Sequence, residues 1–228
     1  MSSDTTAGDT LIQKTIWRLD RGPRPKARGL YHLIAAYLAT IAGTVLITFT
    51  WIHQDWQSGL AVTVYAVGVV ALFGISAAYH RGPWLSQKAV KAWRAADHAT
   101  IALFIAATYT PIAVITLRGH WILIAIWVAV ILSVGLTFFP HPRVLDVVTY
   151  LILGWAVVPL IPAIVDHAGQ AVVWLLAAGG IVYSLGAIFY ALRWPGRNAR
   201  LAGYHEHFHA ATVIAAVVHM VAIWMLVA

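Results

Sequence analysis

Tyr204-His205-Glu206-His207-Phe208-His209 opens an apolar stretch that continues to Ala228. His205 and His209 lie four residues apart, and on a helix this spacing places both imidazoles on the same face. One helix can offer two ligands to a single metal ion in this way. The residues after the pair are apolar, so we expect both histidines just inside one end of a membrane-crossing helix.

The composition excludes an ordinary soluble domain. Of the 228 residues, 61% are hydrophobic and 10% are charged, and the mean hydropathy is +0.79. Soluble domains average about 45–50% apolar and about 25% charged residues. The net charge of +7 would suit nucleic acid on a soluble surface, but the basic residues fall between apolar runs, so we expect no nucleic-acid partner. There is no cysteine, so a metal site has to use His, Asp or Glu.

Seven apolar stretches come close to the roughly 20 residues that a helix needs to cross the hydrocarbon core. Pro111, Pro159 and Pro162 fall inside them, where kinks are tolerated if neighbouring groups satisfy the freed backbone. We therefore predict an all-α integral membrane protein with one seven-transmembrane helix bundle. The predicted spans are 30–52, 60–80, 97–117, 121–139, 145–165, 170–192 and 205–227, and the domain covers 30–228.

The preceding segment, residues 1–29, is polar and basic. Ile12, Ile16 and Leu19 follow the spacing i, i+4, i+7. This pattern predicts a short amphipathic helix over Thr10–Leu19 in the membrane interface, with a disordered tail as the alternative. The first apolar run is too long for the core of a signal peptide, so we expect no signal peptide.

The distribution of Lys and Arg predicts the orientation. In the seven-span arrangement only Arg118 falls on one side, and the other fourteen basic residues share the opposite side. The sequence therefore predicts a cytoplasmic N-terminus and an external C-terminus. The fourteen are Lys14, Arg18, Arg21, Arg24, Lys26, Arg28, Arg81, Lys88, Lys91, Arg94, Arg143, Arg193, Arg197 and Arg200.

Polar residues gather at the cytoplasmic ends of three predicted spans. Ser76 and His80 close the second span, Asp97 opens the third, and His205 and His209 open the seventh. Ser76 precedes His80 by one helical turn, so both face the same way. Ionisable residues inside membrane segments are costly and point to a functional site. We expect these five side chains to meet at one depth of one leaflet.

Other histidines are expected to have different roles. His98 follows Asp97 and is turned about 100° from it, so packing or support is favoured over ligation. His207 projects away from His205 and His209 by the same geometry, toward a neighbour or the interface. His219 lies about 15 Å beyond His209 along the helix. It either lines a mid-membrane cavity or bonds a partner helix, and the cavity is favoured.

Several short motifs occur in order from Pro25 onward. They are Arg28-Gly29-x-x-His32, Ser76-x-x-x-His80, Asp97-His98-x-x-Ile101, Ala107-x-Tyr109-Thr110-Pro111, Tyr183-x-x-Gly186 with Phe189-Tyr190, and His205-x-x-x-His209 followed by His219. In this combination the chain resembles the hemolysin III family, the bacterial branch of the progestin and adipoQ receptor superfamily. His207 departs from the family pattern, in which an apolar residue is commoner. The resemblance implies a multi-pass protein of a bacterial plasma membrane, surrounded by lipids.

The resemblance also implies zinc, held by His80, His205 and His209. The same resemblance implies that Asp97 contacts the metal through a water molecule, and that Ser76 supports this arrangement without touching the metal. Three imidazoles with an open fourth position are typical of a catalytic zinc site, and Asp97 is placed to act as a general base. The family implies hydrolysis of a lipid amide of ceramide type. The alternatives are a receptor or sensor with structural zinc, and a pore-forming cytolysin; the pore ranks last because the spans show no polar stripe.

Overall fold

A computed structural model describes residues 25–228, apart from 85, 117–120, 138, 140 and 197–200. The predicted helix over Thr10–Leu19 lies outside the described residues. The regular elements in the described part of the chain are all helical. They are α2 (Leu30–His53), α3 (Trp56–Arg81), α4 (Gln87–Thr116), α5 (Trp121–Leu136), α6 (Arg143–Trp155), η1 (Val158–Leu160), α7 (Ile161–Ala168), α8 (Gln170–Leu192) and α9 (Tyr204–Val227).

Each of the seven predicted spans contains helix. Within the described residues, six segments are long and apolar enough to cross a membrane, with α6 to α7 counted as one segment over Val144–Ala168. A helix of 24 residues, such as α2 or α9, rises roughly 36 Å, more than the roughly 30 Å of the hydrocarbon core. The seventh candidate crossing is α5, a shorter apolar helix.

Several boundaries differ from the predicted ones, and α3 begins at Trp56 instead of 60. α4 begins at Gln87, ten residues before the predicted span 97–117, because its polar first turns continue the helix beyond the apolar part. α5 ends at Leu136 instead of 139. The Thr137 backbone N–H bonds to the Val134 carbonyl 3.0 Å away, and this tighter i to i+3 turn closes the helix.

The predicted span 145–165 is interrupted in its middle. Pro159 and Pro162 lack the N–H groups that would continue α6 as one regular helix, so the chain passes through η1 into α7. The Tyr109 hydroxyl on α4 lies 3.0 Å from the Leu153 carbonyl and 3.2 Å from the Gly154 carbonyl. It satisfies backbone groups that the end of α6 leaves free, which is the requirement for a break inside a membrane.

Short connections make consecutive helices antiparallel neighbours. α2 packs on α3, α3 on α4, α4 on α5, and α8 on α9. Between α2 and α3, the Asp55 side chain caps α3 by accepting a 2.8 Å hydrogen bond from the Ser58 N–H. This bond lowers the pKa of the Asp55 carboxyl.

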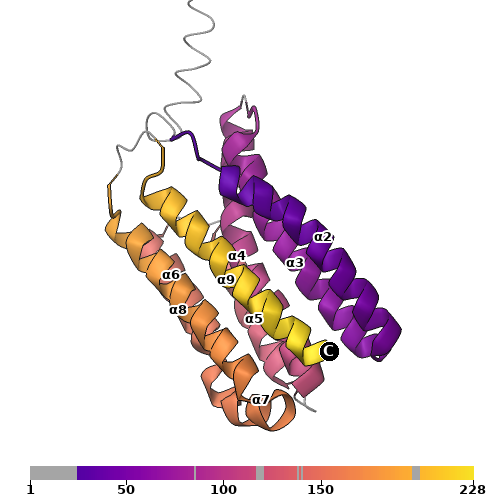
Figure 1. Ribbon diagram of the computed structural model, residues 1–228. Coiled ribbons are helices and arrows are strands. Elements are labelled where there is room, and N and C mark those ends of the chain that lie inside the picture. Colours follow the sequence, from indigo (N-terminus) through magenta and orange to yellow (C-terminus); the bar gives the residue numbers. More distant parts are fainter. Residues whose placement is uncertain (1–24, 85, 117–120, 138, 140, 197–200) are drawn as a thin grey trace, which may run out of the picture.

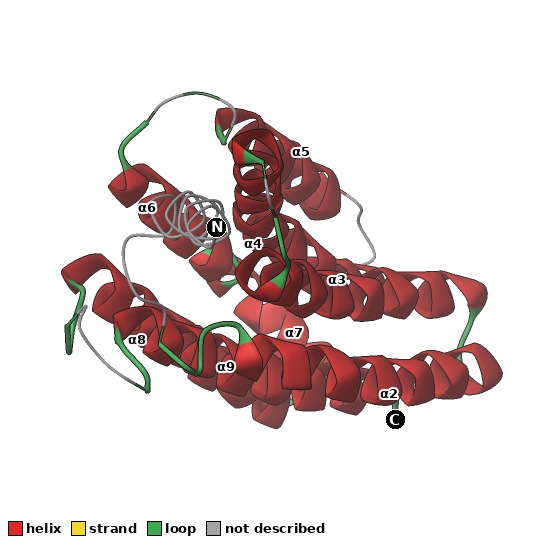
Figure 2. Cartoon of the chain, turned by 90° about the horizontal axis from the view of Figure 1, so that it is seen from above, coloured by secondary structure: helices red, strands yellow, loops and turns green. Residues whose placement is uncertain are grey.

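α4 is the central helix of the bundle, in contact with α3, α5, α6, α7 and α9 (Figure 2). The outer faces of the surrounding helices are apolar, with Tyr37 69%, Ile41 65% and Leu132 66% exposed. Such a surface suits lipid rather than water.

One end of the bundle holds the starts of α2, α4 and α9 and the ends of α3 and α8 (Figure 1). The candidate site lies at this end.

The start of α2 and the end of α9 lie at opposite ends of the bundle, as an odd number of crossings requires (Figure 1). Reporter domains fused after Ala228 and within 82–86, between α3 and α4, are expected to report opposite sides of the membrane, with the 82–86 fusion cytoplasmic. Paired phosphatase and fluorescent-protein fusions measure this. Two fusions on the same side would contradict the seven-crossing arrangement.

Candidate metal site

The three histidines predicted as metal ligands lie close together. His80 stands one residue before the end of α3, and His205 and His209 occupy the first two turns of α9. One ligand nitrogen from each lies within 4.8 Å of the others. Because His80 and His209 are buried and His205 is half-buried, the cluster is open at the His205 side. The three residues could hold one metal ion.

The nitrogen geometry tests whether a metal fits. The Nε2 atoms of His80 and His205 are 3.2 Å apart. Two ligands of a tetrahedral ion with bonds of about 2.0–2.1 Å stand about 3.3 Å apart. The His209 ring centroid is 5.0 Å from that of His80 and 4.6 Å from that of His205. The donor set of three neutral imidazoles therefore suits a divalent transition metal.

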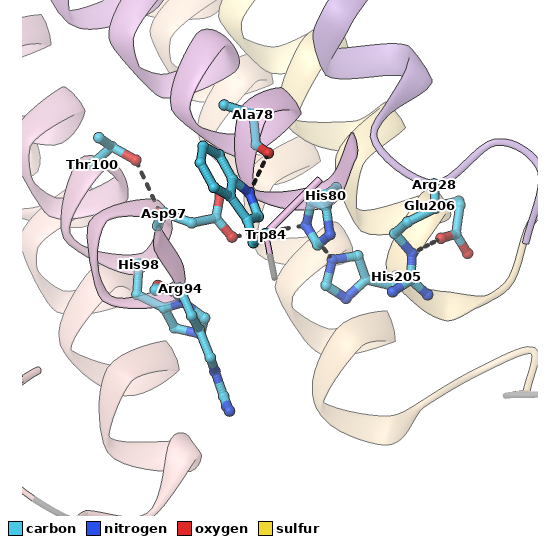
Figure 3. Close-up of polar contacts among 10 residues, drawn as sticks. All are labelled: Arg28, Ala78, His80, Trp84, Arg94, Asp97, His98, Thr100, His205 and Glu206. Carbon is cyan, nitrogen blue, oxygen red and sulfur yellow. Dashed lines mark hydrogen bonds and ion pairs between the residues drawn. The ribbon is translucent and has the colours of Figure 1, made fainter. Parts of the chain in front are cut away.

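Asp97 and Ser76 lie on the other side of His80. Asp97 Oδ2 is 3.8 Å from His80 Nε2, beyond hydrogen-bond distance but close enough for one small molecule to contact both. The Ser76 side chain is a hydrogen-bond partner of the Asp97 carboxylate. Figure 3 shows His80 between Asp97 and His205. The structure thus brings together all five residues that the sequence singled out.

A fourth imidazole, which the sequence analysis did not assign to the site, supports the cluster. His32 on α2 stacks on His209, with ring centroids 3.9 Å apart and planes 6° from parallel. Only 3% of His32 is exposed, and Phe73 lies against it with ring centroids 5.0 Å apart. The stack restrains the plane of the His209 ring. The signal for it was present in the motif Arg28-Gly29-x-x-His32, which places an ionisable group inside a membrane span.

The chain before α2 passes very close to the cluster. Gly29, the residue directly before α2, has a φ of +71°, and a Cβ added to it would lie 2.7 Å from His80 Cβ. Only glycine combines this backbone conformation with this approach. Ala27 N–H also bonds to the Leu201 carbonyl, 3.1 Å away. The segment therefore covers one side of the metal cluster.

Glu206 points away from the three histidines and has a partner of its own (Figure 3). Its carboxylate pairs with Arg28 (Figure 3), and its Oε2 accepts a 2.7 Å hydrogen bond from the Gly203 N–H at the start of α9. Only 1% of Glu206 is exposed. The pair joins the segment before α2 to α9, and so fixes α9 beside His80.

Glu206→Gln is expected to lower the free energy of unfolding by about 3 kcal/mol, because it removes one charge from a buried ion pair. Thermal unfolding of the purified protein in detergent measures the loss. The neighbouring His207 is exposed, so His207→Ala is the control and should change stability by less than about 0.5 kcal/mol. Equal melting of Glu206→Gln and the wild type would show that the pair contributes no stability.

His98 on α4 and His207 on α9 have separate surroundings. His98 Nδ1 donates to the Arg94 carbonyl, 2.9 Å away on its own helix, and the His98 carbonyl accepts from the Tyr150 hydroxyl at 3.1 Å. His98 thus supports the packing of α4 and α6, in agreement with the expectation. His207 is exposed and faces away from the cluster.

A cavity of about 210 Å³ extends from the site into the bundle. At the metal end it is lined by Ser76, Asp97, His205 and His209, and deeper down mostly by apolar side chains of α4, α6, α7, α8 and α9. His219 also lines it, as favoured from the sequence. The deeper lining includes Ile105, Ile112, Leu151, Ile161, Ile164 and Leu176. The cavity can therefore take an apolar chain whose polar end lies at the histidines.

A second carboxylate lines the same end of the cavity. Asp146, near the start of α6, accepts a 2.7 Å hydrogen bond from His141 Nε2, and His141 Nδ1 donates to the Phe139 carbonyl at 2.7 Å. Since both ring nitrogens face acceptors, the doubly protonated imidazole is favoured. The bond to Asp146 accordingly raises the pKa of His141. No sequence pattern indicated that Asp146 would reach the cavity, because its position depends on how α6 packs.

Comparison with known proteins agrees with this architecture. The model of the family described as Haemolysin-III related matches residues 22–220. A Hemolysin-3 of Bacillus cereus is 36% identical over 169 residues, covering 72% of this chain and 76% of the relative. A Hemolysin-3 homolog of Bacillus subtilis (strain 168) is 28% identical over 170 residues, covering 72% and 78%.

The similarity extends to animal proteins. The human monocyte to macrophage differentiation factor is 25% identical over 181 residues, covering 76% of this chain and 73% of that protein. This match supports the wider progestin and adipoQ receptor superfamily that the motifs indicated. With the apolar helices and the family match together, the chain is a multi-pass integral membrane protein and belongs to the haemolysin-III related family.

Proposed function

We propose that this protein is a zinc-dependent membrane hydrolase that cleaves a lipid amide of ceramide type. The observation that carries the proposal is the apolar cavity that reaches His205, His209 and Asp97. The two histidines and Asp97 lie at one end of it, which suits an amphipathic molecule with a scissile bond near the histidines and a chain among the mostly apolar side chains further in. A purely structural metal would have no need of such a cavity.

Zinc is the metal that these ligands favour. Three imidazoles without cysteine suit zinc better than copper(I) or an iron–sulfur cluster, which prefer thiolates. Three protein ligands with an open position are also the arrangement found in catalytic zinc sites. When bound, zinc would supply Lewis acidity to water and to a substrate carbonyl.

Side chains of the protein would transfer the proton of the attacking water to the leaving amine. Asp97 would take a proton from the attacking water as the new C–O bond forms at the amide carbon. It would return the proton to the nitrogen as the C–N bond breaks, which gives a fatty acid and an amine. Ser76, through its hydrogen bond to Asp97, would hold the carboxylate toward the water. Asp97 is 13% exposed on its side chain, so the base is largely shielded from bulk solvent.

The reaction would take place on the cytoplasmic side of a bacterial plasma membrane. The site lies at the end of the bundle where α2 and α9 begin and α3 ends (Figure 1). In the sequence, most of the Lys and Arg residues precede α2 or fall between α3 and α4 or between α8 and α9, and such loops stay cytoplasmic. A lipid would therefore present its amide from the inner leaflet.

The test is release of fatty acid from a panel of ceramides and other lipid amides by purified protein in liposomes. We expect release by the zinc-loaded protein and none by protein stripped of metal with a chelator, with recovery when zinc is added back. If the zinc-loaded protein releases no more fatty acid than the stripped protein across the panel, the hydrolase proposal is wrong.

A receptor or sensor with structural zinc is the second candidate. His80 belongs to α3, and His205 and His209 belong to α9, so a metal would join two helices that are distant in sequence. In that case zinc removal should lower the melting temperature, while no lipid amide is cleaved by either form. The liposome assay together with thermal unfolding separates the two candidates.

A further inference from the structure

A second group of polar side chains lies deep in the cavity. Tyr183 on α8 and His219 on α9 both line it, and their ring centroids are 5.7 Å apart. His219 is ten residues beyond His209, which places it about 15 Å further along α9. Gly179 allows the approach of the two helices here, because a Cβ on it would lie 2.3 Å from the His219 ring. The pair is thus remote from the metal cluster.

The contacts of His219 fix which of its nitrogens carries the proton. Nε2 lies 3.2 Å from the Leu176 carbonyl, which can only accept, so Nε2 carries the hydrogen. A charged imidazole this deep in a membrane would need an anionic partner, whereas the contacts of this ring are with Leu176, Gly179 and Tyr183. In the neutral ring Nδ1 is then an acceptor, and it has no hydrogen-bond partner among the described residues.

Tyr183 adds a second unpaired group beside the first. Its hydroxyl is buried and also has no hydrogen-bond partner in the described part of the chain. Polar atoms in the membrane interior are normally bonded to protein, to water or to a ligand. A hydroxyl placed between the two rings would satisfy both groups, since it can donate to His219 Nδ1 and accept from the Tyr183 O–H.

We propose that Tyr183 and His219 form a site for a hydroxyl group carried partway along the apolar chain of a ligand. The ligand class is therefore a hydroxylated long-chain lipid. The inference rests on the proposed function in one respect, namely that the cavity receives an apolar chain with its polar end at the histidine cluster. A ketone at the same position would fit less well, because it cannot donate to Nδ1.

The probes are palmitic acid, a series of hydroxypalmitic acids that differ in the position of the hydroxyl, and the matching ketopalmitic acids. Binding to the purified zinc-loaded protein in detergent is measured by competition with radiolabelled palmitic acid. We expect one hydroxyl position, or two adjacent ones, to bind about 25-fold tighter than palmitic acid, because each of the two added hydrogen bonds gives about fivefold. The matching ketone can accept from the Tyr183 O–H but cannot donate to His219 Nδ1, so its gain should be only about fivefold.

Three variants assign the preference to its residues. Tyr183→Phe removes the hydroxyl, and His219→Gln keeps a donor toward the Leu176 carbonyl but removes the Nδ1 acceptor. Each variant leaves one of the two hydrogen bonds, so each should reduce the preference to about fivefold while palmitic acid still binds. Tyr37→Phe is the control, because Tyr37 is exposed on the outer face of α2 and does not line the cavity. The control should keep the preference.

The outcomes separate this proposal from the proposed function. If palmitic acid and every hydroxylated probe bind equally well, the hydroxyl site is refuted, and the cavity remains a place for an apolar chain. A gain from the ketone equal to that from the hydroxyl would refute the assigned donor and acceptor roles. If none of the probes binds, the cavity does not receive an apolar chain, and the hydrolase proposal loses its main support as well.

Discussion

Asp97→Asn is expected to lower the turnover of a ceramide-type amide by a factor of about 10²–10⁴, the range for loss of a general base. The amide keeps the shape of the carboxylate and can still bond to Ser76, but it cannot take a proton. Zinc content and thermal stability should therefore stay close to those of the wild type. Fatty-acid release from liposomes, with metal content measured on the same preparation, gives both quantities.

The matched control for this variant is Asp166→Asn, the same change at an exposed carboxylate at the far end of α7. Its turnover should equal that of the wild type. Wild-type turnover in Asp97→Asn would mean that Asp97 is not the base, even if zinc is bound and the substrate is cleaved.

Loss of any one ligand is expected to empty the metal site. His80→Ala, His205→Ala and His209→Ala should each weaken zinc binding by more than roughly 100-fold, since even residues that only support a ligand are worth about 10–100-fold. Asp97→Ala should weaken it less, because its carboxylate stands beside the cluster. Metal analysis and competition with a chromophoric chelator measure the affinity.

His98→Ala and His207→Ala are the controls for the ligand variants. His98 bonds within its own helix and His207 is exposed, so both variants should keep close to one zinc per chain. Full zinc occupancy after loss of His205 or His209 would contradict the three-histidine assignment. Loss of zinc in His207→Ala would show that the register of α9 is different.

The sequence predicted the elements of the site because each signal was local. Hydropathy located the spans, and the i, i+4 spacing of His205 and His209 put them on one face. The depth of His80 and Asp97 followed from their distance to the ends of their spans. Because these independent signals agree, the sequence predicts that residues of three helices lie at the same depth of the membrane.

The contacts between distant segments could not be read in the same way. The stack of His32 on His209 and the pair of Arg28 with Glu206 depend on how α2 packs beside α9. Likewise, Asp146 reaches the cavity only because α6 packs against α4. One sequence gives the faces of its helices but not which faces meet, since packing angles depend on many side chains at once.

The most direct test of the account is the location of zinc itself. Crystals of the purified protein should be measured with X-rays just above and just below the zinc absorption edge. We predict a single anomalous peak per chain among His80 Nε2, His205 and His209, with no fourth protein ligand. No peak, a peak elsewhere, or a fourth side chain closing the coordination would contradict an open site formed by three histidines.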